Sequence, residues 1–154
     1  MRLTKQSNYA VRILMYCAAS NEPLDKVAAI AEVYGVSEYF LFKILQPLVD
    51  KGYIETVRGR AGGIRLGKEP GDITLGEVIR AAEDKFIMAE CFEEDEPTCP
   101  LVNACALNSA LSEALGAFFQ VLDSYTIGDL VANRLKIQEM LGIFAVDGEK
   151  SLPA

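Results

Sequence analysis

Two stretches of helical apolar spacing, separated by a single glycine, limit the folds open to this chain more than any other feature. The first predicts a helix over residues 24–34, which Gly35 would end. The second begins at Ser37, a good N-cap. The two apolar stripes are Val27, Ile30, Ala31 and Tyr34, then Leu41, Ile44, Leu45 and Leu48. Helices joined in this way form a helix-turn-helix, whose second helix enters the major groove of DNA.

A further helix is expected before this pair. Thr4 can cap it, and apolar residues recur at helical spacing up to Ser20, so the pattern predicts a helix over residues 4–20. Asn21-Glu22-Pro23 would end it. Cys17 falls in the apolar stripe, and we interpret it as a small core residue.

The face opposite the leucine stripe of the second helix carries Tyr39, Phe42 and Lys43. Exposed aromatic side chains there would suit contact with thymine methyl groups, while Ser37 and Lys43 reach phosphates or base edges. The alternative is that both aromatic residues belong to the core, as aromatic residues at helical spacing commonly do.

Residues 52–68, GYIETVRGRAGGIRLGK, predict a β-hairpin with a glycine-rich turn. Its tip is expected to carry Arg58, Arg60 and Arg65, with no acidic residue between Glu55 and Glu69 to neutralise them. Such arginines can contact a phosphate backbone or a minor groove. The glycine spacings of nucleotide-binding loops are absent from this segment, which argues against a nucleotide site.

Charge is divided between the two halves of the 154-residue chain, whose net charge is −7. Residues 1–68 hold ten Lys or Arg and six Asp or Glu, a balance of +4, whereas residues 69–154 hold five and sixteen, a balance of −11. The basic half can therefore meet a polyanion. Histidine is absent, which excludes hydrolase triads with a histidine base.

Four cysteines are too few for a disulfide scaffold, and no apolar run is long enough to cross a membrane. We therefore expect a cytoplasmic protein without a membrane partner. Cys91, Cys99 and Cys105 are separated by seven and then five residues, with Pro97 and Pro100 between them. Three thiolates on such a loop can converge on zinc, copper(I) or an iron–sulfur cluster. Buried or redox-inert cysteines are the alternative.

The pattern predicts a fold that is mainly α with a small β-hairpin, a winged helix-turn-helix followed by a long helix. We expect a DNA-binding domain over 1–68, a connecting helix within 69–90, a cysteine loop over 91–105, helices over 106–142 and a flexible tail over 143–154. The connecting helix would begin at the capping box Thr74-Leu75-Gly76-Glu77 and end near Asp84. The long helix, with Leu107, Leu111, Leu115, Phe118 and Leu122 on one side, is interpreted as a dimerisation helix. The alternative is a helix in the chain's own core.

The segments MRLTKQSNYAVRILMY, VSEYFLFKILQPL and VRGRAGGIRL, with the three cysteines before a long helix, resemble the winged-helix iron–sulfur regulators that include IscR, NsrR and RirA. The match covers residues 1–142. The wider first cysteine gap, with MAECFE and CPLV, resembles the RirA branch of rhizobial iron regulators.

The resemblance implies a homodimer that binds double-stranded operator DNA and holds a [4Fe-4S] cluster on Cys91, Cys99 and Cys105. It further implies a repressor of iron-uptake genes, not an enzyme, that releases DNA when the cluster converts to [2Fe-2S] or is lost. NsrR-like members supply an aspartate where this chain has Asn8, so we expect a labile cluster with no strong fourth protein ligand. The acidic residues around Cys91 are further possible oxygen donors, although a solvated acidic loop is the favoured explanation.

The expected DNA contacts are Arg2, Lys5, Ser37, Tyr39, Phe42, Lys43, Arg58, Arg60 and Arg65. Three other functions stay open: a nitric-oxide or redox sensor of the same family, an electron-transfer iron–sulfur protein, and a DNA-binding protein with structural zinc. The electron-transfer alternative leaves the basic half and its arginine hairpin unexplained.

Overall fold

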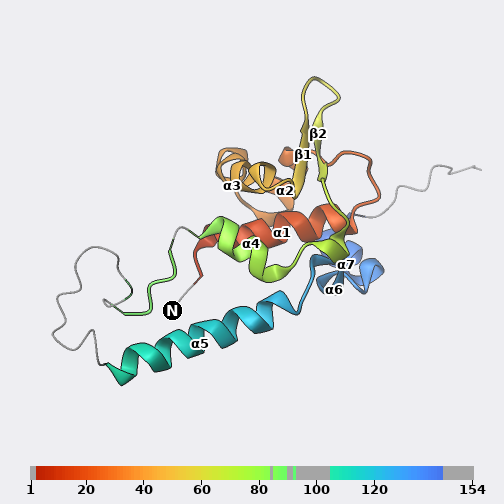
Figure 1. The fold of residues 1–154 in the computed structure, drawn as a ribbon. Helices are drawn as coiled ribbons and strands as arrows, with labels where there is room; N and C mark the ends of the chain where they lie inside the picture. The colour runs from red at the N-terminus through yellow and green to blue at the C-terminus, as the bar shows by residue number, and fades with distance from the viewer. Residues whose placement is uncertain (1–2, 84, 90–91, 93–104, 144–154) are drawn as a thin grey trace, which may run out of the picture.

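A computed structural model describes residues 3–83, 85–89, 92 and 105–143. It is mainly helical, with one two-stranded antiparallel hairpin among the described residues (Figure 1). The helices are α1 (Lys5–Ala19), α2 (Val27–Tyr34), α3 (Glu38–Asp50), α4 (Leu75–Ala82), α5 (Ala106–Asp123), α6 (Ile127–Leu130) and α7 (Arg134–Leu141), and the strands are β1 (Ile54–Val57) and β2 (Gly63–Leu66). A short 3₁₀ helix, η1 (Pro70–Asp72), precedes α4. The predicted fold class is confirmed.

Helix α1 lies at the centre of the described chain and contacts α3, α4, α6, α7 and β2. Its N-terminus is fixed as the sequence predicts, because the Thr4 hydroxyl accepts a hydrogen bond from the backbone N–H of Ser7. Ala10, Ile13 and Leu14 are at most 1% exposed. These side chains pack in one hydrophobic core with the buried residues of the helix-turn-helix.

Helix α2 begins at Val27 rather than at residue 24, so the predicted start was three residues too early. The reason is a competing backbone interaction, since Asp25 and Ile64 exchange N–H to C=O bonds of 2.8 Å each as an isolated antiparallel bridge. The C-terminal end agrees with the prediction, because Gly35 adopts a left-handed conformation with φ of 64°. Leu41, Ile44, Leu45 and Leu48 of α3 are all buried.

The hairpin is held to the helices as well as to itself. Ile54 pairs with Leu66 and Glu55 with Arg65 in the antiparallel register. Ile64, which is 2% exposed, joins the core and also bonds to Asp25 through its backbone. The hairpin is therefore anchored to the start of α2 at one strand, while its turn extends away from the helices (Figure 1).

Helix α4 begins at the predicted capping box of Thr74 and Glu77 but ends at Ala82, and residues 83 and 85–89 are not helical. The prediction of helix to about Asp84 was therefore too long. Helix α5 extends along one side of the molecule (Figure 1), and none of its 18 residues is buried. Leu107 is 61% exposed, whereas Leu111, Leu115, Phe118 and Leu122 are half-buried.

The C-terminal helices α6 and α7 close one end of the core. Helix α7 begins at Arg134, whose guanidinium donates to the carbonyl oxygens of Ala19 and Ser20 at the end of α1. The buried Gln138 amide donates to the same Ala19 oxygen at 2.7 Å. None of the helices in the described ranges combines the length and the apolar character needed to cross a bilayer.

Candidate nucleic-acid interface and cysteine segment

The outer face of α3 presents aromatic and basic side chains together. Tyr39 is 70% exposed and Phe42 is 55% exposed, so the alternative that both belong to the core is wrong. Lys43 Nζ lies 4.6 Å from the centroid of the Tyr39 ring, a cation–π contact between residues one helical turn apart. The Lys43 ammonium is thus held over the Tyr39 ring, on the helix that a helix-turn-helix presents to DNA.

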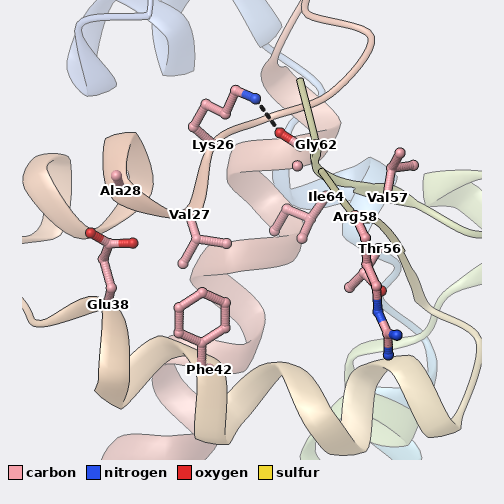
Figure 2. Close-up of a pocket in the computed structure, with 11 residues that line it drawn as sticks. Lys26, Val27, Ala28, Glu38, Phe42, Thr56, Val57, Arg58, Gly62 and Ile64 are labelled. Carbon is pink, nitrogen blue, oxygen red and sulfur yellow. Dashed lines mark hydrogen bonds between the residues drawn. The ribbon is translucent and has the colours of Figure 1, made fainter. Parts of the chain in front are cut away.

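A groove of about 450 Å³ separates this face from the hairpin (Figure 2). Phe42 points toward Val27 across its floor, and Ile64 and Val57 close the hairpin side. The Lys26 ammonium donates to the carbonyl oxygen of Gly62, which ties the start of α2 to the hairpin turn. The remaining residues that line the groove are Ala28, Glu38, Thr56, Arg58 and Gly63.

The hairpin arginines fall into two groups. Arg58 and Arg60 are exposed on the turn side, and no ion pair is found for either within the described ranges. Arg65 lies in β2 rather than at the tip, and its Nη2 atom is 2.8 Å from Glu55 Oε2 on the facing strand. The expectation that Glu55 leaves all three arginines uncompensated was therefore wrong, because the antiparallel register places Glu55 directly opposite Arg65.

The other expected DNA contacts are placed less directly. Ser37 is exposed, but its hydroxyl already accepts from the N–H of Phe40 at 3.2 Å as the cap of α3. Lys5 is exposed in the first turn of α1 and lines a separate pocket with Asn8 and Arg12. Arg2 lies outside the described residues. The geometry thus brings together Tyr39, Phe42, Lys43 and the hairpin, but not Lys5.

An aromatic cluster that the sequence analysis missed joins α1 to the helix-turn-helix. The Tyr9 ring meets Tyr34 at 6.1 Å and Phe40 at 5.3 Å, both edge to face. The Arg12 guanidinium lies 5.0 Å from the Tyr9 ring and 5.7 Å from the Tyr34 ring. Burial raises the pKa of Tyr34 to about 12, and its hydroxyl donates to the Arg12 carbonyl oxygen. The sequence could have indicated this cluster only through the aromatic residues themselves, one on each of the three helices.

The cysteines differ in their surroundings. Cys17 is half-buried and free, and it packs against the core, where burial and then the nearby Asp25 raise the pKa of its thiol well above the ordinary value. Cys105 is half-buried and free, and it occupies the N-cap of α5 without making a side-chain cap hydrogen bond. Cys91 and Cys99 lie outside the described residues, as do Pro97 and Pro100. No group of three possible metal ligands occurs in the part of the chain that the structure describes.

The segment that leads toward Cys91 is attached at two points. The Glu83 carboxylate accepts from the backbone N–H of Thr4 at 2.6 Å and from the hydroxyl of the buried Ser7 at 2.5 Å. The Phe86 ring then packs edge to face on Phe119 of α5, with centroids 4.7 Å apart. Residues 83–89, the lead-in to the cysteines, therefore contact both the start of α1, where Asn8 lies, and helix α5, which follows Cys105.

Comparison with known proteins agrees with this architecture. Residues 3–133 match the Rrf2 family, described as "Iron-dependent Transcriptional regulator". The chain is 60% identical over 143 residues to "Protein aau3" of Rhizobium meliloti (strain 1021), covering 93% of each. It is 44% identical over 142 residues to the "HTH-type transcriptional regulator NsrR" of Bacillus subtilis (strain 168), covering 92% of this chain and 97% of that protein.

Among solved structures, "T. potens IscR" superimposes with a TM-score of 0.68 and 26% identity, covering 90% of this chain and 91% of that one. The family and these regulators act in transcription and are not enzymes. The matched region includes the helix-turn-helix, the hairpin and helices α4, α5 and α6. This chain belongs to the Rrf2 family of transcriptional regulators.

Proposed function

We propose that this regulator is an iron-responsive repressor whose affinity for operator DNA is controlled by a labile [4Fe-4S] cluster on Cys91, Cys99 and Cys105. The cluster-loaded form binds operators of iron-uptake genes, and cluster loss releases them. The family's printed description as iron-dependent supports the iron signal. The resemblance of the cysteine spacing to RirA supports the choice of regulated genes.

The observation that carries the DNA-binding part is the exposed face of α3 beside the hairpin. Tyr39 and Phe42 are more than half exposed although they are large and apolar, which is costly unless a partner covers them. Arg58 lines the groove beside this face, and Arg60 is exposed two residues further along the hairpin turn. We assign Tyr39, Phe42 and Lys43 to the major groove and Arg58 and Arg60 to phosphates or the minor groove.

The chemistry of Cys105 fits a cluster ligand, whereas that of Cys17 does not. A cluster ligand must be a thiolate that the inorganic atoms can reach. Cys105 is free, partly accessible and at the N-terminus of an 18-residue helix, where negative charge is favoured. Cys17 is also half-buried, but it packs against the core, and its raised thiol pKa disfavours the thiolate. When bound, the cluster would supply a redox-sensitive and iron-dependent link among the three thiolates.

Asn8 supports the proposed lability. It is exposed on α1, one turn from Thr4, and Thr4 is bonded to Glu83 at the start of the lead-in to Cys91. An amide at this position is a weaker ligand for iron than a carboxylate. A cluster held by three thiolates alone would therefore exchange its remaining ligand with solvent and decay more readily.

The long helix α5 supports a homodimer. None of its residues is buried against its own chain, and Leu107 and Val121 are 61% and 58% exposed. A helix with an apolar face left open to water is unstable unless that face meets a partner. Pairing of two α5 helices would hold two helix-turn-helix units side by side, as a DNA site with two half-sites requires.

The side chains then have distinct tasks. Arg58 and Arg60 give affinity through charge, while the Tyr39–Lys43 pair and Phe42 read base edges and methyl groups. Glu83 links the start of α1 to the lead-in to the cysteines, and the cluster of Tyr9, Arg12, Tyr34 and Phe40 links α1 to α3. A change at the cysteines would reach the DNA-binding face through these contacts.

The test begins with protein purified without oxygen. Non-denaturing mass spectrometry would count iron, sulfide and subunits, and selection from random duplexes would recover the operator. We expect four irons and four sulfides per chain in a dimer, and operator affinity that falls after iron chelation. A colourless zinc protein that binds the operator equally well before and after chelation would contradict the proposal.

A second candidate is a nitric-oxide or redox sensor on the same cluster, favoured by the 44% identity to NsrR over nearly the whole chain. At a fixed iron supply, nitric oxide or oxidant would then change operator occupancy, whereas iron limitation alone would not. An iron regulator gives the opposite result.

A further inference from the structure

A polar and aromatic clamp joins the C-terminal third of α5 to α4. Arg80 Nη1 donates to Asp123 Oδ1 at 2.8 Å and Nη2 donates to Oδ2 at 2.5 Å, so the pair is bidentate. The same guanidinium lies 4.3 Å from the centroid of the Phe119 ring, one helical turn before Asp123. Phe119 also packs against Phe86, as described above.

The clamp requires a glycine on the facing helix. Gly76 is buried in α4, and a Cβ atom placed there would lie 1.9 Å from Asp123 Oδ1. A side chain at this position would force the Asp123 carboxylate to move from its place beside Arg80. Arg80 and Asp123 are each about 40% exposed, so water weakens the attraction of their charges. Their two-point geometry and the stacked ring nevertheless fix a direction, which a single contact would not do.

The clamp holds α5 near its C-terminal end, and most of the helix extends beyond it. Beyond Phe119, α5 continues to Ala106, a length of about 20 Å at a rise of about 1.5 Å per residue. No residue of α5 is buried along this length. A rotation of about 10° at the clamp would move the far end by about 3 Å, which is comparable to the rise of one base pair.

We propose that the clamp of Arg80, Asp123 and Phe119 sets the angle between α5 and the DNA-binding body, and thereby selects operators by the spacing of their two half-sites. The inference rests on the proposed function, because it needs a dimer formed through α5. Arg80 is a positioning residue here. It acts through the direction of α5 and needs no contact with DNA.

The test measures binding to duplexes that carry the selected operator with its half-sites moved apart or together by one base pair, and to a single half-site. Arg80→Gln breaks the clamp with loss of a charge, and Gly76→Ala displaces Asp123 with no change of charge. Arg134→Ala is the matched control, because it removes a guanidinium that joins α7 to α1 and not α5 to α4.

For the parent and Arg134→Ala, we expect each change of spacing to weaken binding about tenfold, a loss typical of one unfavourable base-pair position. For Arg80→Gln and Gly76→Ala, the loss should shrink to about threefold or less, while all four proteins bind the single half-site alike. Light scattering should show dimers throughout.

Spacing profiles of Arg80→Gln and Gly76→Ala that coincide with that of the parent would overturn the inference. So would monomeric clamp variants beside a dimeric Arg134→Ala, because the clamp would then maintain the dimer rather than set its angle. If the parent protein itself shows no preference for paired half-sites, it is the proposed function that fails.

Discussion

The winged-helix body and helix α5 satisfy their apolar surfaces in different ways. In the body, Leu14, Leu48 and Ile73 are wholly enclosed by the same chain. In α5, the apolar residues are half-buried or exposed, and the helix is held mainly at its C-terminal end. The body therefore has a closed core of its own, whereas α5 presents an apolar surface suited to a partner.

Individual residue types repeat this contrast. Both cysteines are half-buried, but Cys17 packs against the core and its thiol pKa is raised, while Cys105 lies at the start of α5. Arg65 is compensated by Glu55, while Arg58 and Arg60 extend along the hairpin turn. We therefore propose that residues of one type serve structure in one place and binding in another, according to their surroundings.

The largest expected effect is on the free energy of unfolding, which a substitution in the body should lower far more than one in α5. Leu48→Ala should lower the free energy of unfolding by about 2–5 kcal/mol, because it opens a cavity in the closed core. Leu107→Ala in α5 should change the unfolding of the monomer by less than about 0.5 kcal/mol and instead weaken dimerisation. Urea unfolding and sedimentation at several protein concentrations would measure both. If Leu48→Ala and Leu107→Ala lowered the stability of the monomer equally, the proposed difference between the body and α5 would be wrong.

Among the arginines, Arg60→Ala should weaken binding to all duplexes by about fivefold and reduce the slope of log affinity against log salt by about one. Arg65→Ala should have a smaller effect, because Glu55 already offsets that charge. Fluorescence anisotropy over a range of salt concentrations supplies the slopes. An effect of Arg60→Ala confined to one base pair would show instead that Arg60 reads sequence.

At the start of α1, Asn8→Asp should slow cluster decay under a chelator by about threefold to tenfold, since a carboxylate is a better oxygen ligand for iron than an amide. The loss of visible absorbance under anoxic conditions would follow the decay. Asn8→Ser serves as the control of similar polarity without a carboxylate. If the aspartate variant decays as fast as the parent, Asn8 does not limit cluster stability.

The smallest effect concerns the buried Asp25. Burial raises the pKa of its carboxyl, with a further contribution from Glu22, while hydrogen bonds from Ser20 and Cys17 oppose the shift. A raised carboxyl pKa in the folded state gives stability below the unfolded pKa, and that stability is lost as the pH rises through the folded value.

Asp25→Asn should therefore stabilise the fold by up to about 1 kcal/mol at pH 7 and by less at pH 3. Thermal unfolding at the two pH values provides the comparison. If Asp25→Asn is less stable than the parent at pH 7, the charged Asp25 carboxylate stabilises the fold and this prediction is wrong.

The sequence predicts much of the body because its signals are local. Thr4, Ser37 and Thr74 cap the helices that their positions suggest, and Gly35 ends α2. Helical spacing also identifies the buried side of α3. These features depend on neighbours a few residues apart, which a single sequence displays directly.

The errors arise where distant segments meet. The bridge between Asp25 and Ile64 removes the predicted first turn of α2, and strand register brings Glu55 to Arg65. The Arg80–Asp123 clamp joins residues 43 positions apart. For the candidate site, the exposed face of α3 follows from helical period, but the aromatic cluster beneath it depends on how three helices pack, and no local pattern specifies that packing.

In the proposed function, sulfur ligands on the segment before α5 control the affinity of the winged-helix body for DNA. The most direct test of this control is operator occupancy in cells with ample or scarce iron, for the parent and for a variant with serine at positions 91, 99 and 105. We predict high occupancy in the parent only with ample iron, and low occupancy in the variant under both conditions. Occupancy in the variant that still rises and falls with iron as in the parent would contradict the account.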